Sequence, residues 1–574
     1  MIKKTRNRYL AAILAVCVAL AGGAVVAAAA PGVTVSDENQ LVAAVEQAGS
    51  KPLTITLASD IVTTKTLYIP GGTEITFASP EGSMHNIIGA FNSDVVVMRS
   101  KAILIIENIG ITHKEGYSGR AVKFLGTLTI NDGAIYGNTI SGAFSSGAGI
   151  EGNGTLIMNG GAIYGNMCEL DDRATGYQGG GINMIGKFTM NGGVIYGNFT
   201  YHNGGGVYIS GAFTMNGGEI KNNTAYEDSL LHGNGGGVSV LGTFNMNGGS
   251  ITDNAAKNGG GVHIRSVDPG VFYDGIISGN TASADGGGIY HESGEYKLDG
   301  GNISDNRARN GGGVAITGLF KMDGGVISNN NATENGGGVN IENIQGSAGC
   351  FHLNDGAINN NAAQYGGGVA NASEFYMCGG IINANTARTD GGGVDHTVNV
   401  FSFDGGWIYG NRENDIKINQ NANFNNNVVN ENTGAIGNPP PEGATTPSIP
   451  GKYTPPRRPT EVSVVVNGTK LSFDQPPVIE NGRTLVPLRA IFEALGATVG
   501  WNEDTQTVTA VRGDTTVTLQ IGSIVMTKNN EDIFLDVPAK LVGERTMVPA
   551  RAVAESFGAV VGWDEATLTV TITT

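Results

Sequence analysis

The sequence predicts a mainly β protein: a right-handed parallel β-helix solenoid with an N-terminal cap helix, followed by a small duplicated α+β domain. Three observations lead to this prediction. A glycine triad recurs every 24 to 31 residues through the middle of the chain, short strands of period two follow each triad, and a different motif is duplicated near the C-terminus.

Composition restricts the function classes. The 574 residues include 91 glycines, and 34 Lys and Arg stand against 51 Asp and Glu, which gives a net charge of -17. Glycine does not recur at every third position, so a collagen triple helix is excluded, and a hydrophobic fraction of 40% is too high for a disordered chain. Because a phosphate backbone requires a basic surface, the acidic balance argues against a nucleic acid partner.

Residues 1–30 have the pattern of a secretory signal peptide. Basic residues precede an apolar stretch, Leu10–Ala21, and Ala27-x-Ala29 resembles a cleavage site. An uncleaved anchor is the alternative, since the apolar run approaches the length that spans a bilayer. We expect cleavage, and therefore a secreted chain without a transmembrane domain.

Three cysteines remain after residue 30, and their fate is open. Cys168, Cys350 and Cys378 are an odd set without metal-ligand spacing. They predict neither a disulfide framework nor a metal site.

The repeat fills most of the chain. Each triad is followed by an aliphatic-x-aliphatic pair, a Phe-x-Met-Asn-Gly-Gly segment, an Ile and an Asn, so that each unit holds two or three short strands. Such units cannot bury their apolar side alone and must stack. Helical repeats lack support, toxin-type calcium rolls need nonapeptides that are absent, and propeller blades need about forty residues. A parallel β-helix fits best, with one unit per rung. The triads begin at residues 179, 204, 235, 259, 286, 311, 336, 366 and 391.

Turn residues support the same fold. Glycine triads suit tight corners that need a positive φ. A series of asparagines suits stacked turns, because Asn tolerates the left-handed conformation and its amide can donate to the next rung. These are Asn198, Asn254, Asn280, Asn306, Asn385 and Asn411.

The array begins before its first triad. Strands of the same kind are predicted at Leu53–Leu57, Leu67–Ile69, Ile75–Phe77, Ile103–Ile106 and Leu128–Ile130. Before them, 37–48 carries Leu41, Val42 and Val45 on one helical face, with Ser36 or Asp37 as N-cap. A helix there would cover the open end of the first rung. We expect residues 31–437 to form one capped β-helix.

These motifs resemble the right-handed β-helices of the pectin-lyase-like superfamily, in particular its repetitive surface and adhesin-type members. The resemblance rests on the cap helix, the Leu-Thr-Ile-Thr-Leu strand and the Gly-Gly-Gly-Val and Phe-x-Met-x-Gly-Gly-x-Ile-x-x-Asn rungs. It implies the fold but not one function, because that fold includes both polysaccharide lyases and non-catalytic adhesins.

A Pro-rich linker, 438–459, separates the array from residues 460–574. There, Arg483-Thr-Leu-Val-Pro returns as Arg545-Thr-Met-Val-Pro, and a Gly-x-x-Val-Gly-Trp segment ending at Trp501 returns at Trp563. In each copy a Pro is expected to begin a helix and a Gly to end it. The paired Trp side chains are expected to be core anchors.

This segment resembles the copper amine oxidase N-terminal-like domain, also called a stalk domain, which the resemblance associates with exported proteins of Gram-positive bacteria. No His, Cys or Tyr occurs between residues 460 and 574, so we expect no copper and no tyrosine-derived quinone.

Glycan-binding candidates lie in the strands that follow the triads. The residue between the two inward aliphatics should point outward, and aromatic rings there can stack on sugar faces. A solvated sheet face with scattered aromatics is the alternative. The candidates are Tyr208, His263, Arg265, Tyr290 and Glu292. His291 and His396 fall at inward positions and are expected to be structural.

Catalytic candidates are fewer. A lyase needs a base near Ca2+-binding acids or a cation. The best set is Lys297, Asp299, Lys321 and Asp323, which repeat as Lys-x-Asp in consecutive rungs. Their regularity favours a structural role, and no pair of acids suggests a glycosidase.

The sequence therefore predicts an exported, cell-surface or cell-wall-associated protein, whose non-catalytic β-helix displays a face that binds a polysaccharide or cell-wall polymer. The C-terminal domain would tether it. A secreted polysaccharide lyase or glycoside hydrolase is the alternative, and Ca2+ is expected only if the lyase alternative holds. The ligand and the oligomeric state do not follow from the sequence.

Overall fold

The computed structural model describes residues 32–426 and 462–573 with gaps. The expected signal peptide and Pro-rich linker lie outside the described residues. The gaps are 142–145, 170–178, 227–232, 345–346, 398–399, 419–422, 472, 474, 476, 481–482, 504, 522, 524, 530, 535–538, 543–544 and 565–568.

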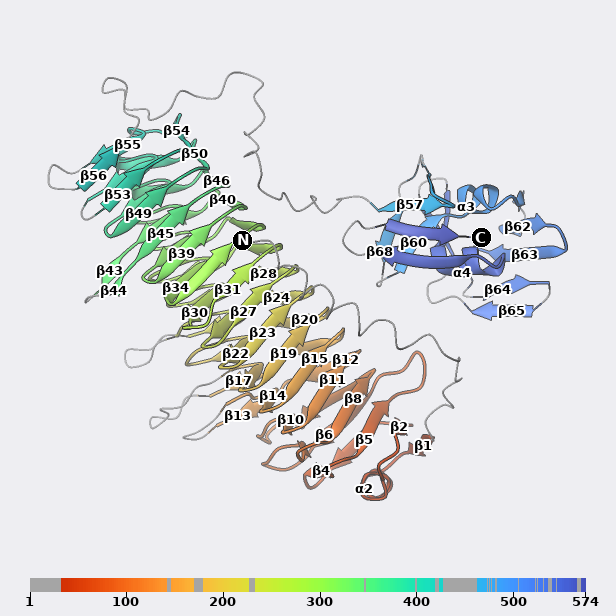
Figure 1. The fold of residues 1–574 in the computed structure, drawn as a ribbon. Coiled ribbons are helices and arrows are strands. Elements are labelled where there is room, and N and C mark those ends of the chain that lie inside the picture. Colours follow the sequence, from red (N-terminus) through yellow and green to blue (C-terminus); the bar gives the residue numbers. More distant parts are fainter. Residues whose placement is uncertain are drawn as a thin grey trace, which may run out of the picture. The chain divides into compact units, whose positions relative to one another are not determined.

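The first unit is a parallel β-solenoid of about 14 turns, as predicted (Figure 1). Within the described residues its strands form four parallel sheets, here called sheets A to D. Sheet A has 16 strands, from β1 (Gly32–Val35) to β56 (Asn423–Asn426). Sheets B and C have 14 each, from β3 (Ile61–Thr63) to β54 (Trp407–Tyr409) and from β4 (Leu67–Ile69) to β55 (Ile416–Ile418). Sheet D has 10, from β13 (Thr139–Ile140) to β51 (Thr386–Asp390).

One rung shows the path of the chain. β22 (Val207–Ile209) lies in sheet C, β23 (Ala212–Met215) in sheet A, β24 (Glu219–Lys221) in sheet B and β25 (Thr224–Ala225) in sheet D. Each strand pairs in parallel with its counterpart in the next rung. The sequence predicted two or three strands per unit, and the two-residue strands of sheet D are the ones that it missed.

The early strands form where expected. The predicted strands begin at β2 (Leu53–Leu57) and include β4, and the other three are each longer by one to two residues. These three are β5 (Glu74–Ala78), β8 (Ile103–Glu107) and β11 (Thr127–Ile130).

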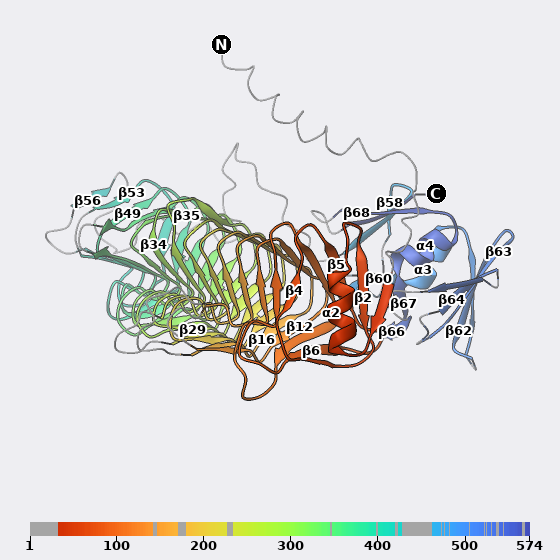
Figure 2. The same ribbon diagram turned by 90° about the horizontal axis from the view of Figure 1, so that it is seen from below.

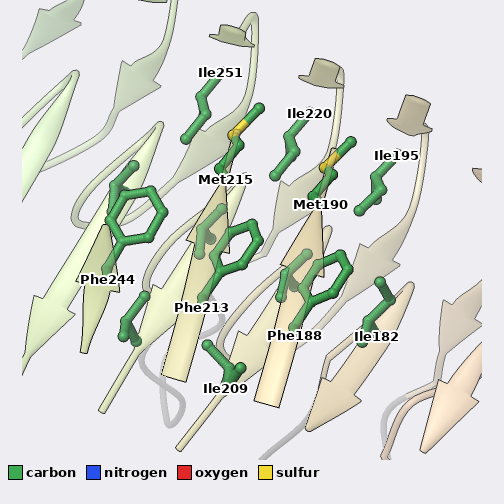
Figure 3. Close-up of a cluster of buried hydrophobic side chains, with 14 of the residues drawn as sticks. Ile182, Phe188, Met190, Ile195, Ile209, Phe213, Met215, Ile220, Phe244 and Ile251 are labelled. Carbon is green, nitrogen blue, oxygen red and sulfur yellow. The ribbon is translucent and has the colours of Figure 1, made fainter. Parts of the chain in front are cut away.

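Inward side chains from three sheets meet in the core (Figure 3). Ile182 comes from β18 (Ile182–Met184) of sheet C, Phe188 from β19 (Lys187–Met190) of sheet A and Ile195 from β20 (Val194–Tyr196) of sheet B. Because each row repeats at every rung, like residues stack: the rings of Phe188 and Phe213 lie 4.7 Å apart and nearly parallel. Burial of this continuous column holds the rungs together.

A buried asparagine ladder runs along the turn between sheets B and D. In each member the Nδ2 amide donates to the Oδ1 of the next asparagine, for example from Asn254 to Asn280 over 3.0 Å, and also to a backbone carbonyl. His113 is hydrogen-bonded to the first member and Asp415 accepts from the last. The members are Asn138, Asn166, Asn198, Asn223, Asn254, Asn280, Asn306, Asn330, Asn361, Asn385 and Asn411.

The predicted donation to the next rung is therefore confirmed, but the predicted left-handed conformation of these asparagines is wrong. The positive φ falls on the residue before each one, such as Asn222 (54°) before Asn223 and Asp253 (56°) before Asn254. That residue turns the chain, which leaves the ladder asparagine free to point inward.

Helix α2 (Glu38–Glu46) lies at the N-terminal end of the solenoid (Figure 2). Asp37 is its N-cap and accepts a 2.9 Å hydrogen bond from the Gln40 amide, while Leu41 and Val45 are buried. The helix contacts β3 and β4, so it covers the first rung as predicted. No helix in the described part of the chain has the length and hydropathy needed to cross a membrane.

The second unit, residues 442–574, has its own hydrophobic core. The two copies of the duplicated motif pair with each other: β60 (Arg483–Pro487) runs antiparallel to β67 (Arg545–Pro549). Each strand leads into a helix, α3 (Leu488–Ala494) and α4 (Ala550–Ser556). β59 (Val478–Glu480) and β66 (Lys540–Val542) flank β60 and β67 in a four-stranded sheet. The remaining described strands form two further sheets: β57 (Ser463–Val466) and β58 (Thr469–Lys470) with β68 (Val560–Asp564) and β69 (Thr569–Thr573), and a five-stranded sheet from β61 (Thr498–Asn502) to β65 (Glu531–Phe534).

Two expectations for this unit need correction. Pro487 ends its strand as the N-cap of α3 and is not its first helical residue, whereas Gly496 does end the helix with a φ of 81°. Trp501 is 43% exposed, so it is not a core anchor. It lies on β61, and Leu495, Phe492 and their neighbours fill the core instead. The Trp563 side chain lies outside the described residues.

Candidate functional site

The candidate site is the outer face of sheet C, where the predicted row of outward side chains lies. The row is real, since Tyr208, Ser239, His263 and Tyr290 pair in register on successive strands. Its expected exposure is wrong in most rungs. Tyr208 and His263 are each only 3% exposed, and Tyr290 is half-buried.

The glycine triads explain this burial. From Gly204 onward the first glycine of each triad has a positive φ, 68° at Gly286, and a Cβ atom on Gly286 would collide with the carbonyl of Ile289 in the strand that follows. The chain therefore folds back against the outer side of its own strand. Asp285, the residue before this triad, is close enough for its charge to raise the pKa of Tyr290. A period-two pattern gives the direction of a side chain and not what covers it.

A polar chain crosses three rungs in this row, on β26 (Val238–Val240), β30 (Val262–Arg265) and β34 (Ile289–Ser293). The Nδ1 atom of His263 lies 3.2 Å from Ser239 Oγ, and its Nε2 atom lies 2.8 Å from Glu292 Oε2. The other oxygen of Glu292 lies 3.4 Å from the Nε of Arg265, whose side chain is largely exposed. The structure thus brings together four of the five predicted glycan-binding residues, with the Tyr290 ring stacked 5.5 Å from the His263 ring.

This order of serine, histidine and carboxylate is that of a nucleophile relay, but Ser239 is only 1% exposed. A substrate cannot reach the Ser239 hydroxyl, so these three side chains cannot act by nucleophilic attack in this conformation. Its physical effect is to hold the Glu292 carboxylate in place beside Tyr290. Burial, followed by the charge of Glu292, raises the pKa of Tyr290 to about 12, so this hydroxyl stays protonated and can donate.

The sequence reasoning missed Glu342 in this region. Burial, followed by the charge of Asp285, raises the pKa of Glu342 to about 7, while Arg309 opposes the shift. Glu342 also contributes to the raised pKa of Tyr290. A signal was present: Arg265, Glu292 and Glu342 each stand six residues after the first glycine of their triads.

Farther along the row, Asp395 of β52 (Val394–His396) is buried. This burial, followed by the charge of Asp390, raises the pKa of Asp395 to about 6. Lys417 opposes the shift and forms a 3.1 Å ion pair with Asp390. The outer face of sheet C therefore carries two acids, Glu342 and Asp395, whose pKa is raised by burial.

The lyase candidates lie elsewhere, on the outer face of sheet A, in β35 (Glu295–Leu298), β39 (Leu319–Met322) and the turns that follow them. Lys297 forms ion pairs of 3.0 Å with Asp299 and 2.9 Å with Asp323, and Lys321 pairs with Glu295 at 2.7 Å. Burial alone would lower the pKa of Lys297, but the hydrogen bonds and charges of the two aspartates outweigh it and raise the pKa. A catalytic base needs the opposite shift. The catalytic assignment stays a prediction, and these ion pairs count against it.

The inward histidines are buried as expected. His291 and His396 are both fully enclosed, and His396 lies 3.0 Å from the Asn371 amide through its Nδ1 atom. The cysteines remain separate: Cys168 is buried, and this burial raises the pKa of its thiol to about 12, while Cys350 and Cys378 are also free thiols.

Comparison with known proteins assigns the second unit. Residues 465–572 match the copper amine oxidase N-terminal domain family. This agrees with the resemblance that the duplicated motif suggested. No curated protein matches the chain in sequence.

The name of this domain family raises the question of copper. Copper in proteins is bound by imidazole, thiolate or thioether ligands, and residues 460–574 contain neither His nor Cys. The two methionines of this domain, Met526 and Met547, are fully buried in its interior. Its described residues also include no group of three or more acidic, His or Cys side chains placed to hold a metal ion. The residues of this domain therefore do not fit a copper site.

Proposed function

We propose that this protein is an exported, non-catalytic cell-surface protein, whose solenoid displays a polysaccharide-binding face and whose C-terminal domain tethers it to the cell wall. The observation that carries the proposal is the combination of a long, regular solenoid with a copper amine oxidase N-terminal domain match. The signal-peptide pattern of residues 1–30 supports export.

The solenoid architecture suits display. The rows that face the core repeat from rung to rung, whereas the outer positions change from polar to aromatic to charged. A rigid scaffold with variable outer side chains can present a ligand surface along many rungs. Tyr290, Glu292 and Arg265 are the accessible members of the predicted glycan-binding set.

The first experiment tests location and tethering together. Cells that express the full chain are fractionated, and the protein is expected in the wall fraction. A variant that lacks 460–574 is expected to be exported but released into the medium, because the tether is missing. Full-length protein found only in the cytoplasm would contradict export, and a truncated variant that stays on the wall would contradict tethering.

A hydrolytic role is the second candidate, and Glu342 is the observation that favours it. A carboxyl group with a pKa of about 7 can act as a general acid at neutral pH, and Glu292 lies on the same face. Uronic-acid and neutral polysaccharides are incubated with the protein, with and without Ca2+. Scission that is lost in Glu342→Gln but retained in Lys297→Ala would support hydrolysis at sheet C and overturn the non-catalytic proposal.

A further inference from the structure

Three aromatic side chains form a corner on the outside of sheet D, here called the aromatic corner. Phe199 belongs to β21 (Phe199–Thr200), Tyr201 follows it, and Tyr226 follows β25 in the next rung. The Tyr201 ring lies 4.9 Å from Phe199 and 5.6 Å from Tyr226, and it is nearly perpendicular to both, at 82° and 80°. Phe199 and Tyr226 are closer to parallel, at 29° and 6.1 Å. Phe199 and Tyr226 are therefore roughly parallel, and Tyr201 stands nearly perpendicular to both.

The aromatic corner is open to solvent. Tyr226 is 50% exposed, and Phe199 and Tyr201 are half-buried. In register with Phe199 the next rung carries Thr224, and later rungs of sheet D carry exposed Thr281, Arg307 and Asn331. The fold thus accepts polar residues at this position, so folding does not explain an aromatic group confined to two rungs.

A second aromatic row provides a contrast. Tyr136, Tyr164 and Tyr196 on the outside of sheet B stack at 5.2 and 4.8 Å with ring planes within 11°. Both faces of the middle ring, Tyr164, are covered by its two neighbours, so only the edge of this ring remains for a ligand. At the aromatic corner Tyr201 is nearly perpendicular to both of its neighbours, so the three rings do not form one continuous stacked column.

The size and chemistry of the aromatic corner indicate its occupant. An aromatic side chain buries about 150–250 Å2 when fully enclosed. Three partly exposed rings therefore offer less than the roughly 800 Å2 per partner of a standard protein interface. A pyranose ring is small and has one apolar face that can stack on an exposed aromatic ring, while the Tyr201 and Tyr226 hydroxyls can donate to and accept from its hydroxyl groups.

We propose that Phe199, Tyr201 and Tyr226 form a binding subsite for a pyranose unit of a neutral polysaccharide. This subsite rests on the proposed polysaccharide-binding function, and it lies on sheet D and not in the sheet C row that the sequence indicated. It gives the solenoid a second contact point along its outer surface.

The experiment measures binding of the full chain to three neutral hexasaccharides, built from β-linked glucose, xylose or N-acetylglucosamine, by calorimetry and saturation-transfer NMR. At least one is expected to bind. Tyr226→Ala should weaken that binding at least tenfold, whereas Tyr226→Phe should change it less than threefold, because the stacking face is kept. Tyr164→Ala is the matched control from the covered column and should leave affinity unchanged.

Tyr226 is exposed enough for truncation to leave folding intact, which an unchanged thermal midpoint verifies. Wild-type affinity in Tyr226→Ala, or failure of all three hexasaccharides to bind the wild-type chain, would overturn the subsite. If that chain still bound cell-wall polysaccharide, the proposed function would stand without the subsite. If the wild-type protein bound neither the hexasaccharides nor cell-wall polysaccharide, both proposals would be contradicted.

Discussion

Two neighbouring stretches of the solenoid differ in their column of core aromatic rings but share the same buried asparagine ladder. In the first, Phe188, Phe213 and Phe244 stack in register with centroid distances of 4.7 and 5.2 Å. In the second, Gly270 occupies the aromatic position, and the Tyr296 ring from the next rung leans toward Phe244, at 6.4 Å and 8°. The aromatic column thus continues across a missing ring, because a larger neighbour fills the space.

The buried asparagine ladder shows no such substitution. It passes through the second stretch unchanged, with Asn254, Asn280 and Asn306 joined by bonds of 3.0 Å. Apolar volume can be supplied by different residues, whereas a buried amide satisfies donors and acceptors at fixed positions. The comparison indicates that the asparagine ladder, more than the aromatic column, fixes how each rung aligns with the next.

Removal of one ladder member is expected to have the largest effect. Asn280→Ala removes the Asn280 partner of the Asn254 backbone amide, of one Asn254 side-chain N–H and of the Ile251 carbonyl. Because each buried unsatisfied group costs about 1–3 kcal/mol, we expect a loss of roughly 4 kcal/mol in chemical unfolding. The matched control is Asn216→Ala in the exposed Asn-Gly-Gly turns, where water replaces the lost bonds and the loss should stay below about 1 kcal/mol. Equal losses would contradict the comparison.

His291 provides a second test, because it is a polar side chain at a core position that is apolar in the adjacent rungs. It occupies the inward place that Ile264 and Ile316 hold in adjacent rungs. Among the described residues its ring nitrogens make no well-aligned hydrogen bond, and only the Ser293 backbone lies near enough to compensate in part. Burial lowers its pKa to about 4, which the Ser293 backbone opposes only in part. We therefore expect His291→Leu to stabilise the protein at pH 7 by about 1–3 kcal/mol.

The pH dependence of this effect has a definite sign. Between pH 6.5 and pH 4 the unfolded chain binds a proton at His291 and the folded chain does not, so stability falls as the pH is lowered through this range. The expected contribution is roughly 3 kcal/mol. It is measured as the difference in unfolding free energy between wild type and His291→Leu at pH 7 and pH 4. A difference that does not grow on acidification would show that His291 is not buried in its neutral form.

The sequence predicted the features that repeat and missed those that depend on single contacts. Period, rung order and the α2 cap follow from the glycine spacing and the Leu41–Val45 face, because every rung must obey the same geometry. Sheet D was missed, since pairs such as Thr224-Ala225 are too short to show a period. Trp501 was placed in the core because duplication reveals equivalence and not burial.

The candidate site shows the same limit. The spacing placed His263, Tyr290 and Glu292 together correctly, because register fixes neighbours across rungs. It did not reveal that Tyr208 and His263 are buried, since burial depends on the path of the connections around a strand. Whether these residues bind glycan stays a prediction.

The turn before each ladder asparagine provides a smaller test. Ala384 has a φ of 55°, where most rungs place Asn, Asp or Gly. A left-handed non-glycine residue costs about 1–2 kcal/mol, partly offset by the entropy that glycine loses on folding. Ala384→Gly should therefore stabilise by about 0.5–1 kcal/mol, and the control Asn360→Gly should gain less, because Asn tolerates this conformation better. Destabilisation by Ala384→Gly in thermal unfolding would show that the turn is not strained.

The smallest effect is expected on the outer face of sheet A. Lys297 is part-exposed, and ion pairs at such positions contribute about 0–1 kcal/mol because solvent screens them. Lys297→Met should therefore cost less than about 1 kcal/mol, and the cost should fall further in 1 M salt. A loss above about 2 kcal/mol would place this cluster with the asparagine ladder as part of what specifies the rung. A small loss would show that outer side chains vary at little cost to folding, and such freedom is what a display surface needs in order to acquire ligand-specific residues.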